Sequence, residues 1–314
     1  MGGPALDRAL RLVLFGDGSW AAASLRQLQQ GRHHVVAVVL RERPSDTTLG
    51  DAARALRVPL LQPRDVNDAA FLDCLRAFTP DLGLSVAYNQ ILRRDVRDSV
   101  PLGCLNVHAG KLPFYRGRNV INWAIINGER EIGVTAHFMD DGIDTGDILV
   151  QHTLPIGWTD TYGDVLSRVV DAIPGLVEES VELVARGDYT TQRQADVVGT
   201  YFGGREEGDE WLDWSDTSAN LHNKVRGISR PGPGARTLLD DRPVIIWRAD
   251  YDPAWPKYIA TPGQVVGRPA GGRLVKTGDS MLLVREVEVG GRVGPPLWQI
   301  GTRLGVQRGG GTHA

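Results

Sequence analysis

The amino-acid sequence predicts an α/β protein in which a Rossmann-like, doubly wound and mostly parallel sheet is followed by a small OB-like β-barrel domain. In the N-terminal part, nearly continuous apolar runs of strand type alternate with segments of helical periodicity. This pattern is typical of parallel strands covered by helices on both faces. In the last third, short strand-like runs are separated by Gly, Pro and Asp, a spacing that favours a small barrel. With 314 residues, the chain is long enough for both domains.

The elements of the first domain follow in order from these patterns. A buried strand over residues 12–15 turns through Gly16 and Gly18 into a helix. Further buried strands are expected in HVVAVVL and DLGLSVAY, with helices in LGDAARALRV and DAAFLDCLRAF. Strands are then expected in LGCLNVHA, EIGVTAHFMD and DILVQHTLPI, and a helix in NVINWAIING. One or two long helices, TYGDVLSRVVDAIPGLVEESVELVARG, close the domain, and Pro174 should bend or break this run.

A change in composition marks the end of the first domain, which we expect to span residues 1–192. The Gly-rich, acidic and aromatic stretch that follows suits a linker, placed at 193–205. Residues 206–305 are expected to form a helix, TSANLHNKVRGI, and the barrel strands RPVIIWRAD, GQVVGR, RLVKTG and SMLLVREVEV. The ending at 306–314 has the composition of a disordered tail.

Charge and composition exclude several classes of protein. The net charge of −3 and the pI of about 6.2 offer no global basic field, so we expect no nucleic-acid partner. The longest apolar runs, such as VVAVVL, are too short to span a membrane, and the charged start MGGPALDRAL is not a signal peptide. Two cysteines, Cys74 and Cys104, are too few for a disulfide framework and fit a reducing cytosol. A cytoplasmic protein is expected.

Two polar side chains leave the end of the strand in LGCLNVHA. Asn106 and His108 stand two residues apart, so they point to the same face at the C-terminal end of a parallel strand, where open α/β sheets build their sites. About 36 residues later, the loop DDGIDTGDIL supplies Asp144. An Asn amide can stabilise a developing oxyanion, a His can shuttle a proton, and a carboxylate can orient the imidazole. The three residue types therefore suit direct transfer of an acyl group to an amine.

Other interpretations of these residues remain open at this point. The turn FGDGSW can cradle an anion at a helix N-terminus through Gly16 and Gly18, or it can simply be a tight turn that needs two glycines. A zinc site of Cys104, His108 and Asp144 is conceivable but lacks a clear fourth ligand, so no metal is expected. His137 is expected to point away from the site or to pack in the core.

The segment LNVHAGKLPFYRGRNVINWAIINGEREIGVTAHFMDDGIDTGDIL resembles the 10-formyltetrahydrofolate-dependent formyltransferases. The resemblance spans most of residues 12–150 and rests on Asn-x-His, Leu-Pro-x-x-Arg-Gly and Asp-x-Gly-x-Asp-x-Gly-x-Ile. It implies an enzyme that uses 10-formyltetrahydrofolate as formyl donor. It assigns Asn106 to polarise the formyl carbonyl, His108 to mediate proton transfer, and Asp144 to hold His108 or a relay water.

The resemblance also implies a folate pocket between YNQIL and DDGID. Backbone groups do most of that recognition in the family, and Ile91 and Leu92 suit the apolar face of the pterin ring. The residues implied are Tyr88, Asn89, Gln90, Ile91, Leu92, Asp140, Asp141, Gly142 and Ile143.

The acceptor amine is expected to belong to a small molecule, above all a nucleotide-linked amino sugar. HAGKLPFYRGRNVINWAIINGE looks more like the amino-sugar enzymes, and the link RERPSDTTLGDAARAL lacks the longer basic insertion of the tRNA enzymes. The second domain, however, is similar to that of methionyl-tRNA formyltransferases and of a bifunctional aminoarabinose enzyme. Initiator methionyl-tRNA and N5-hydroxyornithine therefore remain alternatives, as does a folate- or sugar-binding module without turnover.

The resemblance allows a homodimer, as amino-sugar formyltransferases often are. Arg226 and Arg230 suit a diphosphate, because the arginine fork matches phosphate, but a solvated helix face and its C-terminus explain them equally well. Lys111 and Arg116 suit an anion, but Arg116 equally suits a brace of its own loop. The candidate acceptor-binding residues are Gly16, Gly18, Lys111, Arg116, Arg226 and Arg230.

Overall fold

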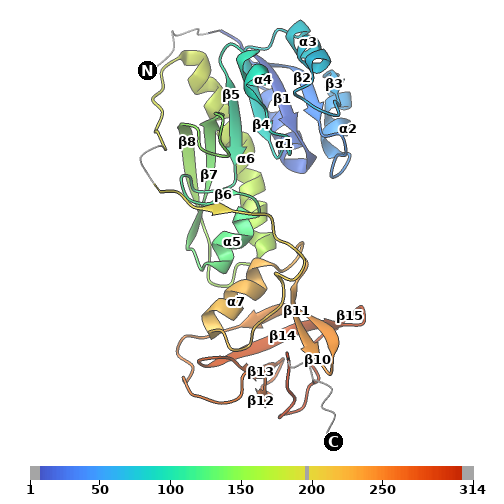
Figure 1. Ribbon diagram of the computed structural model, residues 1–314, viewed down its shortest axis with the longest axis vertical. Coiled ribbons are helices and arrows are strands. Elements are labelled where there is room, and N and C mark those ends of the chain that lie inside the picture. Colours follow the sequence, from blue (N-terminus) through green and yellow to red (C-terminus); the bar gives the residue numbers. More distant parts are fainter. Residues whose placement is uncertain (1–7, 195–197, 306–314) are drawn as a thin grey trace, which may run out of the picture. The chain divides into compact units, whose positions relative to one another are not determined.

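The computed structural model describes residues 8–194 and 198–305, and the expected tail at 306–314 lies outside them (Figure 1). The contacts divide the chain into two compact units. The first takes the chain up to Gly117, Ile132–Leu154 and Ser167–Phe202, and the second takes Arg118–Glu131, Pro155–Leu166 and the chain from Gly203 on. The domain boundaries expected at 192 and 205 stay a prediction. The division into units adds that Arg118–Glu131 and Pro155–Leu166 group with the C-terminal residues.

Seven strands form the sheet of the first unit, in the order β3-β2-β1-β4-β5-β7-β8. Strand pairs β2–β3, β1–β2, β1–β4 and β4–β5 are parallel, and β5–β7 is antiparallel. The expected Rossmann-like, mostly parallel sheet is thereby confirmed. The strands are β1 Arg11–Gly16, β2 His34–Leu40, β3 Leu60–Leu61, β4 Leu82–Val86, β5 Cys104–His108, β7 Glu131–Phe138 and β8 Ile148–Pro155.

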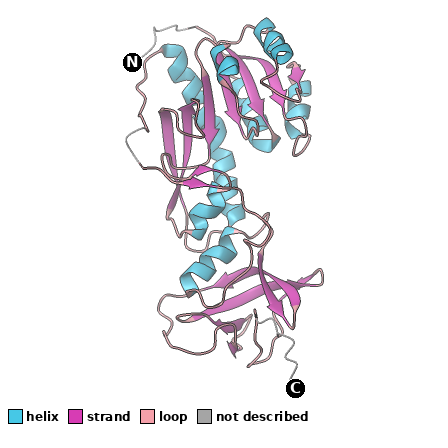
Figure 2. Ribbon diagram, in the orientation of Figure 1, coloured by secondary structure: helices cyan, strands magenta, loops and turns pink. Residues whose placement is uncertain are grey.

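Helices connect the parallel strands, as Figure 2 shows by colour. They are α1 Gly18–Leu28, α2 Thr48–Ala55, α3 Ala69–Ala77 and α4 Arg94–Asp98. Local sequence explains the start of α3, where the side chain of the N-cap residue Asp68 accepts a hydrogen bond from Ala70 N. Strand β4 is buried at every position, as expected for a strand with neighbours on both sides and helices on its faces.

The long helix α6, Tyr162–Arg186, continues through Pro174, where the sequence led us to expect a bend or break. Proline removes one hydrogen bond from a helix interior. An apolar stripe at helical spacing outweighs that loss, because it is almost completely buried on both sides of the proline. The stripe consists of Val165, Val169, Ile173, Leu176, Val177, Val181 and Val184.

The second unit contains helices α5 Val120–Ile126 and α7 Ser218–Gly227 and a curled antiparallel sheet in the order β10-β11-β14-β13-β12, with β15 paired to β14. Isolated bridges Leu239–Leu304 and Gln264–Arg303 add a further segment at the edges formed by β10 and β12. This curled half-barrel is the small β-domain that the sequence predicts. Its strands are β10 Ala235–Leu239, β11 Arg242–Asp250, β12 Val265–Gly267, β13 Arg273–Lys276, β14 Met281–Val289 and β15 Arg292–Gly294.

Two short strands, β6 Arg116–Gly117 and β9 Tyr201–Phe202, pair in parallel within the first unit. In the described parts of the chain, no helix combines the length and the apolar character that crossing a membrane requires.

Candidate active site

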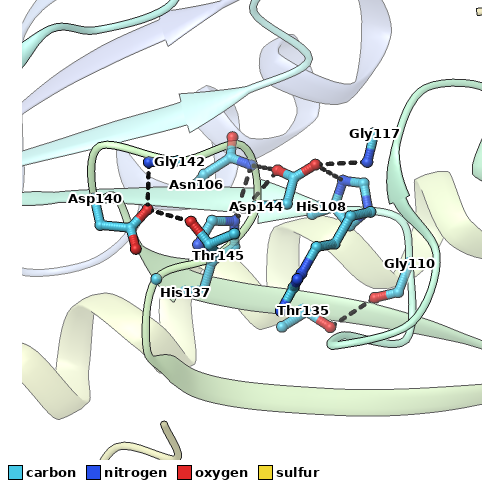
Figure 3. Close-up of polar contacts among 12 residues, drawn as sticks. Asn106, His108, Gly110, Gly117, Thr135, His137, Asp140, Gly142, Asp144 and Thr145 are labelled. Carbon is cyan, nitrogen blue, oxygen red and sulfur yellow. Dashed lines mark hydrogen bonds and ion pairs between the residues drawn. The ribbon is translucent and has the colours of Figure 1, made fainter. Parts of the chain in front are cut away.

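The end of β5 brings the predicted residues together in the first unit (Figure 3). Asn106 and His108 lie on one face of this strand, as period-2 alternation predicts, and Asp144 reaches them from the loop between β7 and β8. His108 is only 8 % exposed. The three side chains singled out from the sequence therefore form one cluster.

Asn106 donates two hydrogen bonds from its amide nitrogen, one to Asp144 Oδ1 and one to His137 Nε2, each at 3.2 Å. His137 Nδ1 lies 2.9 Å from Phe138 O, and because a carbonyl can only accept, Nδ1 carries the proton and Nε2 is free to accept. His137 is 2 % exposed and so is packed, as one of the two expected alternatives had it, but it points to the site and not away from it. Antiparallel pairing sets His137 opposite Asn106, and this register is not visible in either strand alone.

His108 is held in one tautomer by the loop that follows β5. Its Nε2 donates to Tyr115 O at 2.6 Å, which leaves Nδ1 unprotonated and 3.6 Å from Asp144 Oδ2. The turn comes so close that a Cβ on Gly110 would lie 2.5 Å from His108 Nε2. Burial lowers the pKa of His108 below its usual value, an effect that the negative charge of Asp144 partly opposes. His108 is therefore a neutral imidazole at neutral pH, ready to accept a proton at Nδ1.

Asp144 is ionised and tightly held. Burial alone would raise the pKa of its carboxyl, but the polar groups around it, among them His137, His108 and the Gly117 N–H, together lower it to about 2. Gly117 N donates to Asp144 Oδ2 at 2.8 Å. The Asp144 backbone has φ = 54°, in the left-handed region that costs a non-glycine residue about 1 kcal/mol or more. Backbone strain at a buried, ionised group is typical of a functional site.

The cluster matches the chemistry of acyl transfer to an amine. The Asn106 amide can donate to an oxyanion once it turns from its present partners, His108 can take up a proton, and Asp144 stabilises the imidazolium that results. Cys104 does not join them, because it packs in the core, where a Cβ on Gly83 would lie 2.5 Å from its Sγ. Burial raises the pKa of this thiol to about 12. Within the described residues, Cys104, His108 and Asp144 do not converge into a group that could hold a metal ion.

One of the two segments expected around the pterin, the DDGID loop, is held by Arg97 of α4, the helix that follows YNQIL. Arg97 donates to Asp140 O and to the Asp141 carboxylate, and it is 9 % exposed. Ile91 and Ile143 are exposed by 64 % and 47 %, so both offer apolar surface at this place. Sequence analysis missed Arg97, although a basic residue one turn into the helix after YNQIL was a signal.

Leu92 is a correction: it is 1 % exposed and belongs to the apolar core with α3 and α4, so its side chain does not offer a face to a ring. Tyr88 is half-buried with its hydroxyl 3.4 Å from Leu40 O, and Gln90 binds Val66 N and Arg64 O.

The remaining pterin candidates are exposed. Asn89 is exposed, and Asp140, Asp141 and Gly142 lie in the exposed loop, where Asp140 Oδ1 accepts from Gly142 N and Thr145 Oγ1. Apart from Leu92, the assignment of these residues to the pterin stays a prediction.

The glycine turn after β1 has a packing reason. A Cβ on Gly16 would lie 2.5 Å from Ala21 Cβ, and Gly18 has φ = 65°. The Asp17 carboxylate occupies the turn, where it accepts from Ser45 N and pairs with Arg41 at 3.1 Å. A carboxylate repels an anion, so the geometry favours the tight-turn alternative over the anion cradle.

The candidate cations are placed in different ways. Arg116 donates through Nε and Nη2 to Gln194 Oε1, at 3.2 and 2.9 Å, which matches the alternative that it braces its loop. Lys111 is half-buried in the same loop. Arg226 is a correction: it is 5 % exposed and donates to Gly157 O and Asp160 O, so the second unit's own backbone uses its guanidinium. Arg230 is exposed, lies over the Trp247 ring at 4.2 Å and pairs with Glu286.

Comparisons with known proteins show the family of this chain. Residues 10–179 match the family model described as formyl transferase, and residues 206–294 match that of the formyl transferase C-terminal domain. The chain is 35 % identical over 290 residues to the methionyl-tRNA formyltransferase of Pelotomaculum thermopropionicum, covering 90 % of this chain and 92 % of that protein. It is 33 % identical over 294 residues to the methionyl-tRNA formyltransferase of Desulfotalea psychrophila, covering 91 % and 90 %.

Among solved structures, an N-formyltransferase from Helicobacter canadensis in complex with folinic acid and dTDP-3-aminofucose has a similar fold. The TM-score is 0.67 with 17 % identity, covering 88 % of this chain and 99 % of that one. At this identity the likeness concerns the fold alone. The family models and the sequence relatives carry the assignment: the chain belongs to the formyltransferase family and is an enzyme that uses 10-formyltetrahydrofolate as its formyl donor.

Proposed function

We propose that this formyltransferase acts on the α-amine of a methionyl-tRNA. The observation that supports this acceptor is identity of 33–35 % along about nine-tenths of both chains to methionyl-tRNA formyltransferases, with both domains included. The main expectation from the sequence, a nucleotide-linked amino sugar, has support only from solved structures at much lower identity. The expectation that nucleic acid is not a partner thereby loses its support.

Exposed arginines in the second unit suit a phosphate backbone. Protein contacts to nucleic acids go mostly to phosphates, and they depend on local positive groups rather than on the net charge of the chain. The slightly acidic pI is therefore compatible with a tRNA acceptor. The exposed arginines on or beside the curled sheet include Arg230, Arg242, Arg248 and Arg292.

The residues of the site divide the work of transfer. The folate donor supplies the formyl group, and the loop held by Arg97, with Ile91 and Ile143, fits its ring. Asn106 turns its amide N–H groups from Asp144 and His137 toward the oxygen on which negative charge develops. As the amine nitrogen bonds to the formyl carbon, His108 takes the amine proton at Nδ1, directly or through a water, and its new charge is stabilised by Asp144 Oδ2. The bond from the formyl carbon to the folate nitrogen then breaks, and the proton passes to that nitrogen, so that tetrahydrofolate leaves.

A nucleotide-linked amino sugar is the second candidate acceptor. It is favoured by the short connection between β2 and α2, residues 41–47, where the resemblance leads us to expect a longer basic insertion in the tRNA enzymes. Arg41 lies in this connection, where its guanidinium donates a hydrogen bond to Ala87 O and pairs with Asp17, so the protein itself already engages this charge.

An acceptor screen separates these candidates. Purified protein and 10-formyltetrahydrofolate would be mixed with charged initiator tRNA, with UDP-, dTDP- and GDP-linked amino sugars, or with N5-hydroxyornithine, and tetrahydrofolate release would be followed. We expect turnover with the tRNA and a kcat/KM that falls steeply with salt, because phosphate contacts are screened. Turnover with an amino sugar and none with tRNA would overturn the proposal. Folate binding without turnover on any acceptor, unchanged in His108→Ala, would instead indicate a binding module.

A further inference from the structure

Gln194 lies just after α6, 50 residues from Asp144, and its side chain is fully used in hydrogen bonds. Its Nε2 donates to Asp144 O at 3.2 Å and to Gly146 O at 2.5 Å. Its Oε1 accepts from Arg116 Nε and Nη2. The residue is 3 % exposed. A buried amide with four partners is a strong constraint on whatever it touches.

The partners leave no freedom in how this amide is oriented. Carbonyl oxygens can only accept and a guanidinium can only donate, so Nε2 must face the Asp144 loop and Oε1 must face Arg116. Glutamate at this position would keep the contact with Arg116 but would set a carboxylate oxygen against two carbonyl oxygens. Methionine would fill the space and make neither contact.

Gln194 supports both partners of the hydrogen bond from Gly117 N to the Asp144 carboxylate. On one side, Gln194 holds the backbone carbonyl of Asp144, whose φ of 54° needs support from its surroundings. On the other side it holds Arg116, and the next residue, Gly117, donates its N–H to Asp144 Oδ2. Gln194 therefore spans the contact between Gly117 and Asp144.

The same chain segment supports the loop further along. Arg116 N donates to Thr200 O, and Tyr115 N donates to Thr200 Oγ1. Tyr115 is the residue whose carbonyl accepts from His108 Nε2, and its ring stacks on Phe202 at 5.0 Å. Both groups that orient His108, the Tyr115 carbonyl and the Asp144 carboxylate, are thus held by residues that follow α6.

We propose that Gln194 is a positioning residue for formyl transfer, which sets the Asp144 carboxylate against His108 by clamping the Asp144 loop to Arg116. It acts through Asp144 and does not touch the reacting groups. Nothing in the Asn-x-His or Asp-x-Gly motifs points to it, because it lies outside both. The charged and titratable groups around His108 are Asp144 from the β7–β8 loop and His137 from β7, with Arg116 behind Gln194.

The test compares Gln194→Met with Gln192→Met, the same substitution two residues earlier on an exposed side chain. With whichever acceptor turns over, we expect Gln194→Met to lower kcat about 10- to 100-fold, with KM for the folate donor changed less than threefold. Its Tm should fall, because the partners of the amide lose their hydrogen bonds, but the variant should stay folded at the assay temperature. Gln192→Met should match the wild type. Gln194→Glu should be as defective as Gln194→Met, since it restores only the Arg116 side.

A second measurement needs no acceptor. Histidine labelled at Cε1 would be titrated by NMR, with the His108 signal identified by its loss in His108→Gln. The pH midpoint of the His108 titration should fall in Gln194→Met, because Asp144 is no longer held beside the imidazolium. It should stay at the wild-type value in Gln192→Met. An unchanged midpoint together with a kcat within twofold of wild type would overturn the proposal. So would recovery of activity in Gln194→Glu, or a loss of kcat that only follows a loss of folded protein. Neither result depends on which acceptor is correct.

Discussion

Replacing Asp144 by asparagine removes one charge from the site and leaves its shape. The Asn oxygen can still accept from Gly117 N, so the loop should keep its place. What is lost is the stabilisation of His108 after it takes up a proton at Nδ1, 3.6 Å from Asp144 Oδ2. At an effective dielectric constant of about 20, two unit charges at that distance interact by roughly 4.6 kcal/mol.

That energy sets the size of the expected defect. At 1.36 kcal/mol for each factor of ten, losing most of it slows transfer about 10³-fold. We expect kcat of Asp144→Asn to fall by about that factor at pH 7.5, while KM for the folate donor changes less than threefold, because the carboxylate acts on the imidazolium and not on the bound ring. The assay is the initial rate of tetrahydrofolate release.

A matched control lies in the same loop region. Asp147 accepts a hydrogen bond from Thr191 and contacts neither His108 nor Asn106 in the described structure. Asp147→Asn should keep kcat within about twofold, because it removes a charge from the loop without changing the surroundings of the imidazole. A kcat loss below tenfold in Asp144→Asn, or an equal loss in both variants, would refute the charge-stabilising role.

Three further outcomes follow from the structure. Burial lowers the pKa of His108, and His108 must be neutral to act as the base, so kcat/KM of the wild type should fall only as pH drops below about 6.5. A fall in kcat/KM that begins at a higher pH would contradict the assignment. Arg97→Met should raise KM for the folate donor about tenfold with kcat nearly unchanged, since it frees the loop that we place against the ring; an unchanged KM would remove Arg97 from the folate site. Gly16→Ala should lower the free energy of unfolding by about 1–3 kcal/mol, because the added Cβ clashes with Ala21. Gly175→Ala should raise it by roughly 0.5–1 kcal/mol, because Gly175 has open space around it on an exposed face of α6. Urea unfolding measures both, and equal effects would show that contacts at Gly16 do not matter.

The sequence alone predicted the parallel sheet, the small β-domain and the three residues at the centre of the site. Each prediction depends on a local pattern. Apolar runs and helical periodicity are set by neighbouring residues, and the two-residue spacing of Asn106 and His108 places both on one face of a strand wherever that strand lies. Asp144 was found because its motif is contiguous in the chain.

The tertiary structure decided what surrounds these residues. His137 meets Asn106 through a strand pairing that joins residues 31 apart, and Gln194 reaches Asp144 across 50 residues. Leu92 turned out to point into the core and Arg226 to bind backbone carbonyls, because the side on which a loop or helix residue lies depends on what packs against it. Local sequence determines which side chains a strand end offers. Only the folded chain determines which distant groups set their protonation and orientation, because those contacts depend on how separate segments are placed.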